Sequence, residues 1–276
     1  MERRALDVVV ISDIHLGTYG CRAKELHSYL RSIQPEMLIL NGDIFDGWQF
    51  SKRYFPSSHI QVIRELIQFI GNGTRVIYIT GNHDEMLRRY TDLHMGSFSL
   101  TDKLVLEIDQ KMTWIFHGDV FDNTTKGSAR LIAKLGSSGY GMLIIFNRLV
   151  NIVLGFIGRE KVSISKKIMQ GVNKAVAKVN DLEQIASSLA INKKYDYVIC
   201  GHIHQPAMKT VENSDGKVEY LNSGDWVENM TALEYVNKAW TLFQYNPKDF
   251  PDSNPIENSQ PLNVLTEEFT TLLAKS

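Results

Sequence analysis

The stretch LDVVVISDIH, residues 6–15, is a run of aliphatic and mostly β-branched residues that ends in an aspartate and a histidine. Four further runs of the same kind follow it: PEMLILNGDIFD (35–46), TRVIYITGNHDE (74–85), KMTWIFHGD (111–119) and YDYVICGHIH (195–204). Near-continuous apolar character is typical of strands that are buried on both faces of a sheet. The five runs therefore predict strands of a covered sheet, each followed by polar residues at its carboxyl end.

Two stretches between the first three runs have the spacing of helices. RAKELHSYLRSI (22–33) and SHIQVIRELIQFI (58–70) repeat apolar residues at roughly helical intervals, which is typical of a helix with one face packed on a sheet. The order strand, helix, strand, helix, strand predicts an α/β fold. In such folds ligands gather outside the carboxyl ends of the strands, and the polar residues of the runs lie at those ends.

The composition is that of an ordinary globular protein. The chain has 276 residues, enough for one large α/β domain or for a domain with an insertion. Its formal net charge of −1 gives no support to nucleic-acid binding through phosphate neutralisation. The start, MERRALDVVVISD, lacks the long apolar core and the cleavage site of a secretory signal. Cys21 and Cys200 form no CxxC pair, so we expect a reducing cytoplasmic compartment and two buried thiols.

Residues 122–180 differ from the rest of the chain in charge. They contain ten lysines or arginines and two acids, a net charge of +8, and include the apolar stretch MLIIFNRLVNIVLGFIG (142–158). That stretch is too short and too polar to predict a membrane span, which needs about 20 apolar residues. Two interpretations stay open: a buried helix or homodimer contact, or an interfacial helix that accepts lipid. Residues 246–276 predict a Pro- and Asn-rich connector followed by a short amphipathic helix.

The ends of the five predicted strands carry seven nitrogen or oxygen donors and no thiolate: Asp13, His15, Asp43, Asn82, His117, His202 and His204. If adjacent strand ends converge, this set is too large for a single tetrahedral zinc site. It suits two divalent ions that share a carboxylate, and mixed imidazole and oxygen ligands favour manganese, iron or zinc. The sequence therefore predicts a dinuclear metal centre.

The segment GNHDE (81–85), taken alone, has two interpretations. In one, Gly81 makes a turn, Asn82 caps a helix and the acids lie in its first turn, where they suit the helix dipole. In the other, the segment supplies a metal ligand and a proton donor at the end of a strand. The other four runs favour the second interpretation, because they end in the same kinds of residue.

The polar ends of the runs resemble a known family. DIH (13–15), GDIFD (42–46), GNHD (81–84), HGD (117–119) and GHIH (201–204) are similar, in this order, to the five motifs of the calcineurin-like metallophosphoesterases. The resemblance implies a two-sheet α/β sandwich flanked by helices, and a metal-dependent hydrolase of phosphoric esters or diphosphates. Residues 1–121 and 181–245 would form its core, with 122–180 as an inserted helical lid. We expect manganese in the centre, with iron and zinc as alternatives.

The resemblance also implies roles for single residues. Asp13, His15, Asp43 and His204 would bind one metal ion, and Asp43, Asn82, His117 and His202 would bind the other, so that Asp43 bridges them. His83 would face the phosphate and stabilise charge or protonate the leaving oxygen. Asp46 would orient the His83 imidazole, whereas Asp84 would act as a cap, as a support or directly in the chemistry.

A finer resemblance concerns the substrate. DIHLGTYGCRAKEL, GDIFDGW, GTRVIYITGNHDE, HGDVFD and NSGDWVENMTALEY are similar to stretches of the bacterial UDP-2,3-diacylglucosamine diphosphatases of lipid A biosynthesis. This implies a lipid-linked pyrophosphate substrate, a cytoplasmic protein peripheral on the inner membrane, and contact with an anionic membrane surface. The chain departs from that branch at His83, where the diphosphatases have arginine and read GNRD.

Several functions remain open at this point. The substrate could be a different phospholipid phosphate, or a soluble nucleotide phosphodiester, although the apolar segment 142–158 argues against a small polar substrate. A binding scaffold with a vestigial metal site is disfavoured, because none of the seven donors is missing. Trp48 and Trp226 lie beside the motifs and could line a substrate pocket or pack beneath the loops.

Overall fold

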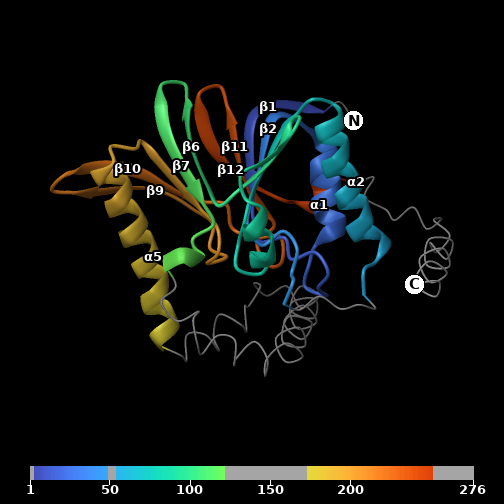
Figure 1. Cartoon of the computed structure of the whole chain (residues 1–276), viewed down its shortest axis with the longest axis horizontal. Helices are drawn as coiled ribbons and strands as arrows, with labels where there is room; N and C mark the ends of the chain where they lie inside the picture. The colour runs from blue at the N-terminus through green and yellow to red at the C-terminus, as the bar shows by residue number, and fades with distance from the viewer. Residues whose placement is uncertain (1–2, 49–53, 122–172, 251–276) are drawn as a thin grey trace.

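The computed structural model describes residues 3–48, 54–121 and 173–250. Within these ranges the chain forms two β-sheets with helices on their outer faces (Figure 1). The seven-stranded sheet has the order β12-β11-β1-β2-β3-β5-β4, with β1 (Arg4–Ile11), β2 (Ile33–Asn41), β3 (Arg75–Ile79), β4 (Leu93–Met95), β5 (Phe98–Thr101), β11 (Thr231–Val236) and β12 (Ala239–Gln244). The five-stranded sheet has the order β6-β7-β8-β10-β9, with β6 (Lys103–Ile108), β7 (Lys111–Phe116), β8 (Tyr197–Cys200), β9 (Ala207–Asn213) and β10 (Gly216–Asn222).

The described helices divide between the outer faces of the two sheets. α1 (Ala23–Ser32) and α2 (Ser57–Gly71) lie against the seven-stranded sheet, and α5 (Asn173–Asn192) lies against the five-stranded sheet (Figure 1). The described residues also form three short 3₁₀ helices: η1 (Glu85–Tyr90) and η2 (Asp119–Phe121), which follow β3 and β7, and η3 (Pro247–Asp249), which follows β12. None of the helices in the described ranges has both the length and the apolar character that crossing a membrane requires.

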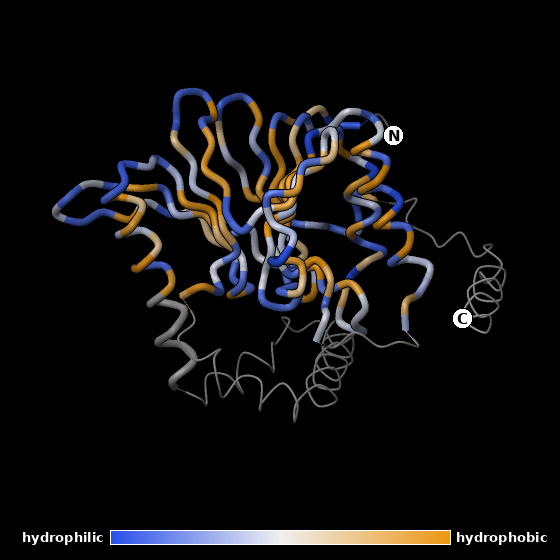
Figure 2. The backbone as a smooth tube through the Cα atoms, viewed as in Figure 1, coloured by the Kyte–Doolittle hydropathy of each residue, from blue (hydrophilic) through white to orange (hydrophobic). Residues whose placement is uncertain are grey.

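Three clusters of buried residues hold these layers together. One joins α1 and α2 to the seven-stranded sheet through residues such as Leu26, Phe69 and Leu38. A second fills the space between the sheets, where Val10 and Ile39 meet Ile199. A third packs Ala186 of α5 and its neighbours against the five-stranded sheet. The strands are accordingly apolar at the centre of the molecule, and the β9–β10 hairpin tip is hydrophilic (Figure 2).

The structure confirms the predicted α/β fold with two sheets flanked by helices. Each of the five apolar runs contains a strand, namely β1, β2, β3, β7 and β8, and both helical stretches form helices, α1 and α2. The expected boundary at residue 180 falls within α5, and the rest of the lid segment, 122–172, lies outside the described residues. The predicted C-terminal helix lies outside them too, whereas the connector begins with η3 and with Phe250 stacked on Tyr245.

Candidate metal centre

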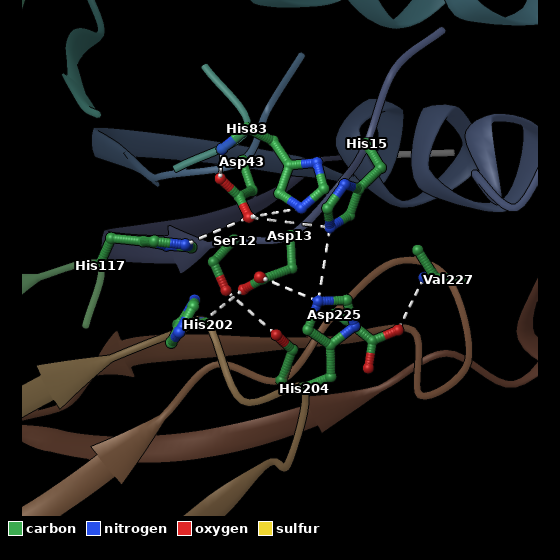
Figure 3. Close-up of polar contacts among 12 residues, drawn as sticks. Ser12, Asp13, His15, Asp43, His83, His117, His202, His204, Asp225 and Val227 are labelled. Atoms are coloured by element: carbon green, nitrogen blue, oxygen red, sulfur yellow. Dashed lines mark hydrogen bonds and ion pairs between the residues drawn. The ribbon is translucent and has the colours of Figure 1, made fainter. Parts of the chain in front are cut away.

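The predicted donors follow the carboxyl ends of strands in both sheets. β1, β2 and β3 run parallel in one sheet, and β7 and β8 run parallel in the other. The loops after each group of strands therefore lie at one edge of each sheet. Figure 3 shows side chains from these loops pointing toward one another across the space between the two edges. The centre thus draws its donors from five separate segments of the chain.

Five of the donors have a left-handed backbone: Asp13 (φ 52°), His15 (φ 55°), Asp43 (φ 55°), His202 (φ 66°) and His204 (φ 52°). This conformation is uncommon for residues other than glycine. It persists where the surrounding structure over-determines it, which happens most often at functional sites. The loops are therefore built to place these side chains at an energetic cost to the backbone.

The donor atoms form three overlapping groups, in each of which they lie within 4.8 Å of one another: Asp13, His15 and His204; His15, Asp43 and His83; and Asp43, His117 and His202. In the first group, His204 Nε2 lies 3.2 Å from Asp13 Oδ1 and 3.4 Å from His15 Nε2. In the third group, His117 Nε2 lies 3.3 Å from Asp43 Oδ2. Asp43 and His15 link the groups, so that the donors make one continuous centre.

Two of the imidazoles are oriented by a partner on the ring nitrogen that faces away from the centre. His15 Nδ1 lies 3.0 Å from Asp46 Oδ2. His117 Nδ1 lies 2.8 Å from the backbone oxygen of Asn41 and donates to it. Carboxylate or carbonyl partners of this kind fix the tautomer of metal-binding histidines and leave Nε2 free to bind the ion. Both rings are thus prepared to coordinate a cation through Nε2.

His83 lies beside the donors with a different set of neighbours. Its Nδ1 is 2.9 Å from Asp46 Oδ2, and its Nε2 is 4.0 Å from Asp43 Oδ2. The Trp48 ring covers it at a centroid distance of 4.4 Å. Burial lowers the pKa of His83, but the hydrogen bond to Asp46 and the charges of Asp43 and Asp46 outweigh it and raise the pKa above its usual value. Asp43 and Asp46 therefore favour the protonated form of the ring, whose Nε2 faces the centre.

The segment GNHDE does not form the capped helix of the alternative interpretation. The following helix is η1, which begins at Glu85 with Asp84 at its N-cap position and no side-chain cap. Asp84 instead joins two loops of the site: Oδ1 accepts from the Gly81 amide at 2.6 Å, and Oδ2 accepts from the Ile44 amide at 3.0 Å. The Tyr78 hydroxyl also donates to Oδ2, at 2.6 Å. Asp84 therefore supports the site and does not cap a regular helix.

The buried carboxylates and imidazoles perturb one another strongly. Burial raises the pKa of Asp13, but the charges of His204 and His117 lower it to about 2. Burial lowers the pKa of His117, but the charges of Asp43 and Asp13 raise it to about 10. Burial likewise lowers the pKa of His204, but Asp13 raises it to about 9. Without a metal ion, the protonated forms of His117 and His204 neutralise the negative charge of Asp13 and Asp43. A bound cation would take over this role.

The residues fit a divalent cation. The buried atom Asn82 Oδ1 has no hydrogen-bond partner among the described residues, and buried polar atoms of this kind are rare without a function. The donor set combines imidazole nitrogens with carboxylate and amide oxygens, which suits zinc, iron or manganese. The described donors therefore have the chemistry and the mutual distances of a cation site.

The structure brings together the predicted residues Asp13, His15, Asp43, His83, His117, His202 and His204, with Asp46 behind two of the rings. Asn82 is buried in the same loop as His83. Of the two tryptophans that lie beside the motifs, Trp48 is 37% exposed and lies on His83, whereas Trp226 is fully buried and packs near Tyr29. Trp226 therefore packs beneath the loops, which was one of the two predicted roles of these tryptophans. Both cysteines are buried thiols, as predicted.

Sequence reasoning did not assign a role to the loop after β10. Asp225 and Asn229 lie in this loop, and the Asn229 side chain contacts the backbone of His204. Their signal in the sequence is NSGDWVENM (222–230), in which polar residues follow a strand as they do in the five runs. No histidine marks this segment, so it does not stand out as a source of donors.

Comparison with known proteins gives a family and a set of distant relatives. The model of the calcineurin-like phosphoesterases matches residues 6–206. A UDP-2,3-diacylglucosamine hydrolase of Aliivibrio fischeri is 23% identical over 244 residues, covering 86% of this chain and 98% of the relative. One of Blochmanniella pennsylvanica is 28% identical over 241 residues, covering 84% and 93%. Among solved structures, an archaeal phosphodiesterase is 16% identical with a TM-score of 0.40, covering 86% of this chain and 98% of its own.

Proposed function

Because the chain belongs to the calcineurin-like phosphoesterase family and is a hydrolase of phosphate esters, we propose that it uses two divalent cations to hydrolyse a lipid-linked pyrophosphate of the UDP-2,3-diacylglucosamine kind. The observation that carries the proposal is the convergence of carboxylates and imidazoles from both sheets. Five of the converging residues have a left-handed backbone. A purely structural cluster would not need this strain, whereas a pre-organised cation site does.

The proposal assigns the donors to two positions that share Asp43. One position consists of Asp13, His15, Asp43 and His204, and the other of Asp43, Asn82, His117 and His202. We propose manganese as the native ion, because the set mixes imidazole nitrogens with carboxylate and amide oxygens. When bound, a pair of such ions neutralises phosphoryl oxygens and activates water for in-line attack.

His83 and Asp46 would act on the substrate from the protein side. The Asp46 carboxylate lies 2.9 Å from His83 Nδ1, which leaves the proton on Nε2 directed toward the centre. There it would donate a hydrogen bond to a phosphoryl oxygen or a proton to the leaving oxygen. Trp48 shields one face of the ring from solvent. His83 is therefore proposed as the catalytic residue and Asp46 as the group that orients it.

The lipid part of the substrate rests on the names of the relatives and on the sequence. The relatives are named for UDP-2,3-diacylglucosamine and match most of this chain. We propose that residues 122–180 form a lid that accepts acyl chains, and that their net charge of +8 attracts the anionic cytoplasmic face of the inner membrane. The protein would then be cytoplasmic and peripheral, with a homodimer contact at 142–158 as the alternative use of the apolar stretch.

The first experiment measures hydrolysis of UDP-2,3-diacylglucosamine by metal-depleted protein, with and without added Mn²⁺. We expect no reaction without metal and recovery with Mn²⁺, and full activity of metal-depleted protein would contradict the proposal. A soluble chromogenic phosphodiester is tested in parallel. Faster turnover of that diester than of the lipid substrate would favour a nucleotide phosphodiesterase.

The second experiment tests the lid. It compares the acylated substrate with its deacylated analogue in the intact protein and in a variant carrying Leu149→Glu and Val153→Glu. Each buried methylene adds about 0.8 kcal/mol to lipid binding, so the intact protein should prefer the acylated form and the variant should lose this preference. If both proteins treat the two substrates alike, residues 142–158 do not bind acyl chains.

A further inference from the structure

The loop between β10 and β11, residues 223–230, contains a buried carboxylate that none of the proposed chemistry uses. Asp225 is fully buried. Its Oδ1 accepts hydrogen bonds from the backbone amides of Val227, Glu228 and Asn229 at 2.7, 2.5 and 3.2 Å. Figure 3 shows this carboxylate beside His204, with its bond to Val227. The three amide contacts fix the conformation of the loop from inside.

Asn229 connects this carboxylate to a histidine of the metal centre. Its side-chain nitrogen donates to the backbone oxygen of His204 at 2.8 Å and also contacts Asp225 Oδ2. The two acceptors use both protons of the amide. The amide is thus fixed between a buried charge and the backbone that carries the imidazole of His204.

His204 needs such a support because its backbone is left-handed, with φ 52°. This conformation is unfavourable for a residue with a side chain, and it holds only if contacts with the surroundings favour it. The imidazole that depends on this backbone lies 3.2 Å from Asp13 Oδ1 and 3.4 Å from His15 Nε2. A change in the His204 backbone would therefore move one donor out of this group of three.

The same loop also holds the backbone of Asp13. The Trp226 amide donates to the Asp13 carbonyl at 3.1 Å, and the Ser223 hydroxyl lies 2.8 Å from that of Ser12. The ring of His117 is oriented by a residue outside this loop, since its Nδ1 donates to the Asn41 carbonyl on β2. The loop therefore supports one half of the centre more directly than the other.

We infer that Asp225 and Asn229 are positioning residues that set the cation affinity of the position formed by Asp13, His15 and His204, separately from the position that contains His117. The inference rests on the proposed function, since it requires that the centre binds divalent cations. Neither residue belongs to the groups of candidate donors among the described residues. They act through the backbone of His204, in the way that outer partners of metal ligands tune metal affinity.

The test is a calorimetric titration of the metal-depleted protein with Mn²⁺. We compare the wild type with Asn229→Ala and with Asn229→Asp, which keeps the shape of the side chain but replaces the N–H donor with a carboxylate oxygen that faces Asp225 Oδ2 and the His204 carbonyl. Asn213→Ala is the matched control, because it likewise removes an asparagine side chain that makes a hydrogen bond to the backbone, in this case one accepted from the Asp215 amide at the β9–β10 turn. Thermal melting without added metal shows whether each variant is folded.

Both Asn229 variants should bind one Mn²⁺ 10- to 100-fold more weakly and the other within about threefold of the wild type, while the control binds both like the wild type. Equal losses at the two positions, or no loss at either, would overturn the inference. A wild type that binds no Mn²⁺ would instead contradict the proposed function. The two failures are therefore distinguishable.

A double-mutant cycle gives a second, site-specific readout. His204→Ala removes the donor that Asn229 supports, so adding Asn229→Ala to it should leave the remaining Mn²⁺ affinity unchanged. A further loss in the double variant would show that Asn229 supports the whole centre or the fold, and would overturn the inference.

Discussion

Asp46 is the residue whose replacement tests the organisation of the site most sharply, because one carboxylate oxygen serves two rings. Asp46 Oδ2 lies 3.0 Å from His15 Nδ1 and 2.9 Å from His83 Nδ1. The carboxyl group is buried, and its pKa is lowered because the contacts with the two histidines outweigh the effect of burial. Asp46→Asn removes the charge, keeps the size and leaves one carbonyl oxygen for two donors.

The expected loss follows from these two contacts. A hydrogen bond to a charged group contributes about 1.5–3 kcal/mol. The asparagine oxygen can still accept from one ring as a neutral partner, so roughly one charged contact is lost and the other is weakened. We therefore expect the activation free energy that corresponds to kcat/KM to rise by about 3–4 kcal/mol. This lowers kcat/KM on the order of 100- to 1,000-fold. The lost contact with His15 should lower the affinity for Mn²⁺, and the lost contact with His83 should lower the rate of hydrolysis.

The assay measures kcat and KM at saturating Mn²⁺, together with Mn²⁺ affinity by calorimetry, for Asp46→Asn and for His83→Ala. His83→Ala should keep both metals and lose rate, since the proposed role of His83 is on the phosphate. Asp46→Asn should lose rate at saturating Mn²⁺ and also bind the ion more weakly. A kcat/KM within threefold of the wild type would refute the reasoning, because it would show that neither ring depends on Asp46.

Three further predictions concern space, protons and stability. Gly81→Ala should weaken Mn²⁺ binding and lower stability by about 1–3 kcal/mol, because the new Cβ would lie 2.6 Å from the Asp43 amide nitrogen; unchanged Mn²⁺ affinity and melting temperature would contradict this. Mn²⁺ binding near pH 7 should release about two protons, since the pKa values of His117 and His204 are about 10 and 9 among the protein groups alone, and the ion binds neutral imidazole. Mn²⁺ affinity should therefore rise with pH up to about 10 and weaken as pH falls. Calorimetry in two buffers of different ionisation enthalpy counts the protons, and equal affinity at pH 6 and pH 8 would disprove the coupling. Tyr29→Phe should lower the free energy of unfolding by about 1.5–3 kcal/mol, because the buried Tyr29 hydroxyl donates to Glu234 at 2.9 Å; urea unfolding measures this, and a variant as stable as the wild type would show that the bond adds nothing net.

The strands and donors of the centre could be predicted because their signals are local. A buried strand reads as an apolar run, and a donor such as His117 or His202 stands directly after one. The pairing of the strands in two sheets was not in the pattern itself, and it entered through the resemblance to a family. The structure adds the reason that the loops converge, which is the parallel pairing of β1, β2 and β3, and of β7 and β8.

The supports of the site were harder to predict because they join residues that are far apart in the sequence. Ser12 contacts Ser223, and Asn229 contacts the backbone of His204. A contact between a side chain and a distant backbone leaves no periodic signal. The alternative of a helix capped by Asn82 is wrong for a different reason. Asp84 turns inward to bind the Gly81 and Ile44 amides, and only the short helix η1 follows it.

The central claim is that hydrolysis requires two cations, bound at two positions that share Asp43. The most direct test follows the initial rate of UDP-2,3-diacylglucosamine hydrolysis as Mn²⁺ is added to metal-depleted protein at a concentration above the dissociation constants. We predict that the rate reaches its plateau at two equivalents per chain in the wild type, and that Asp43→Asn shows no such plateau. A plateau at one equivalent, or full activity before any metal is added, would contradict the account.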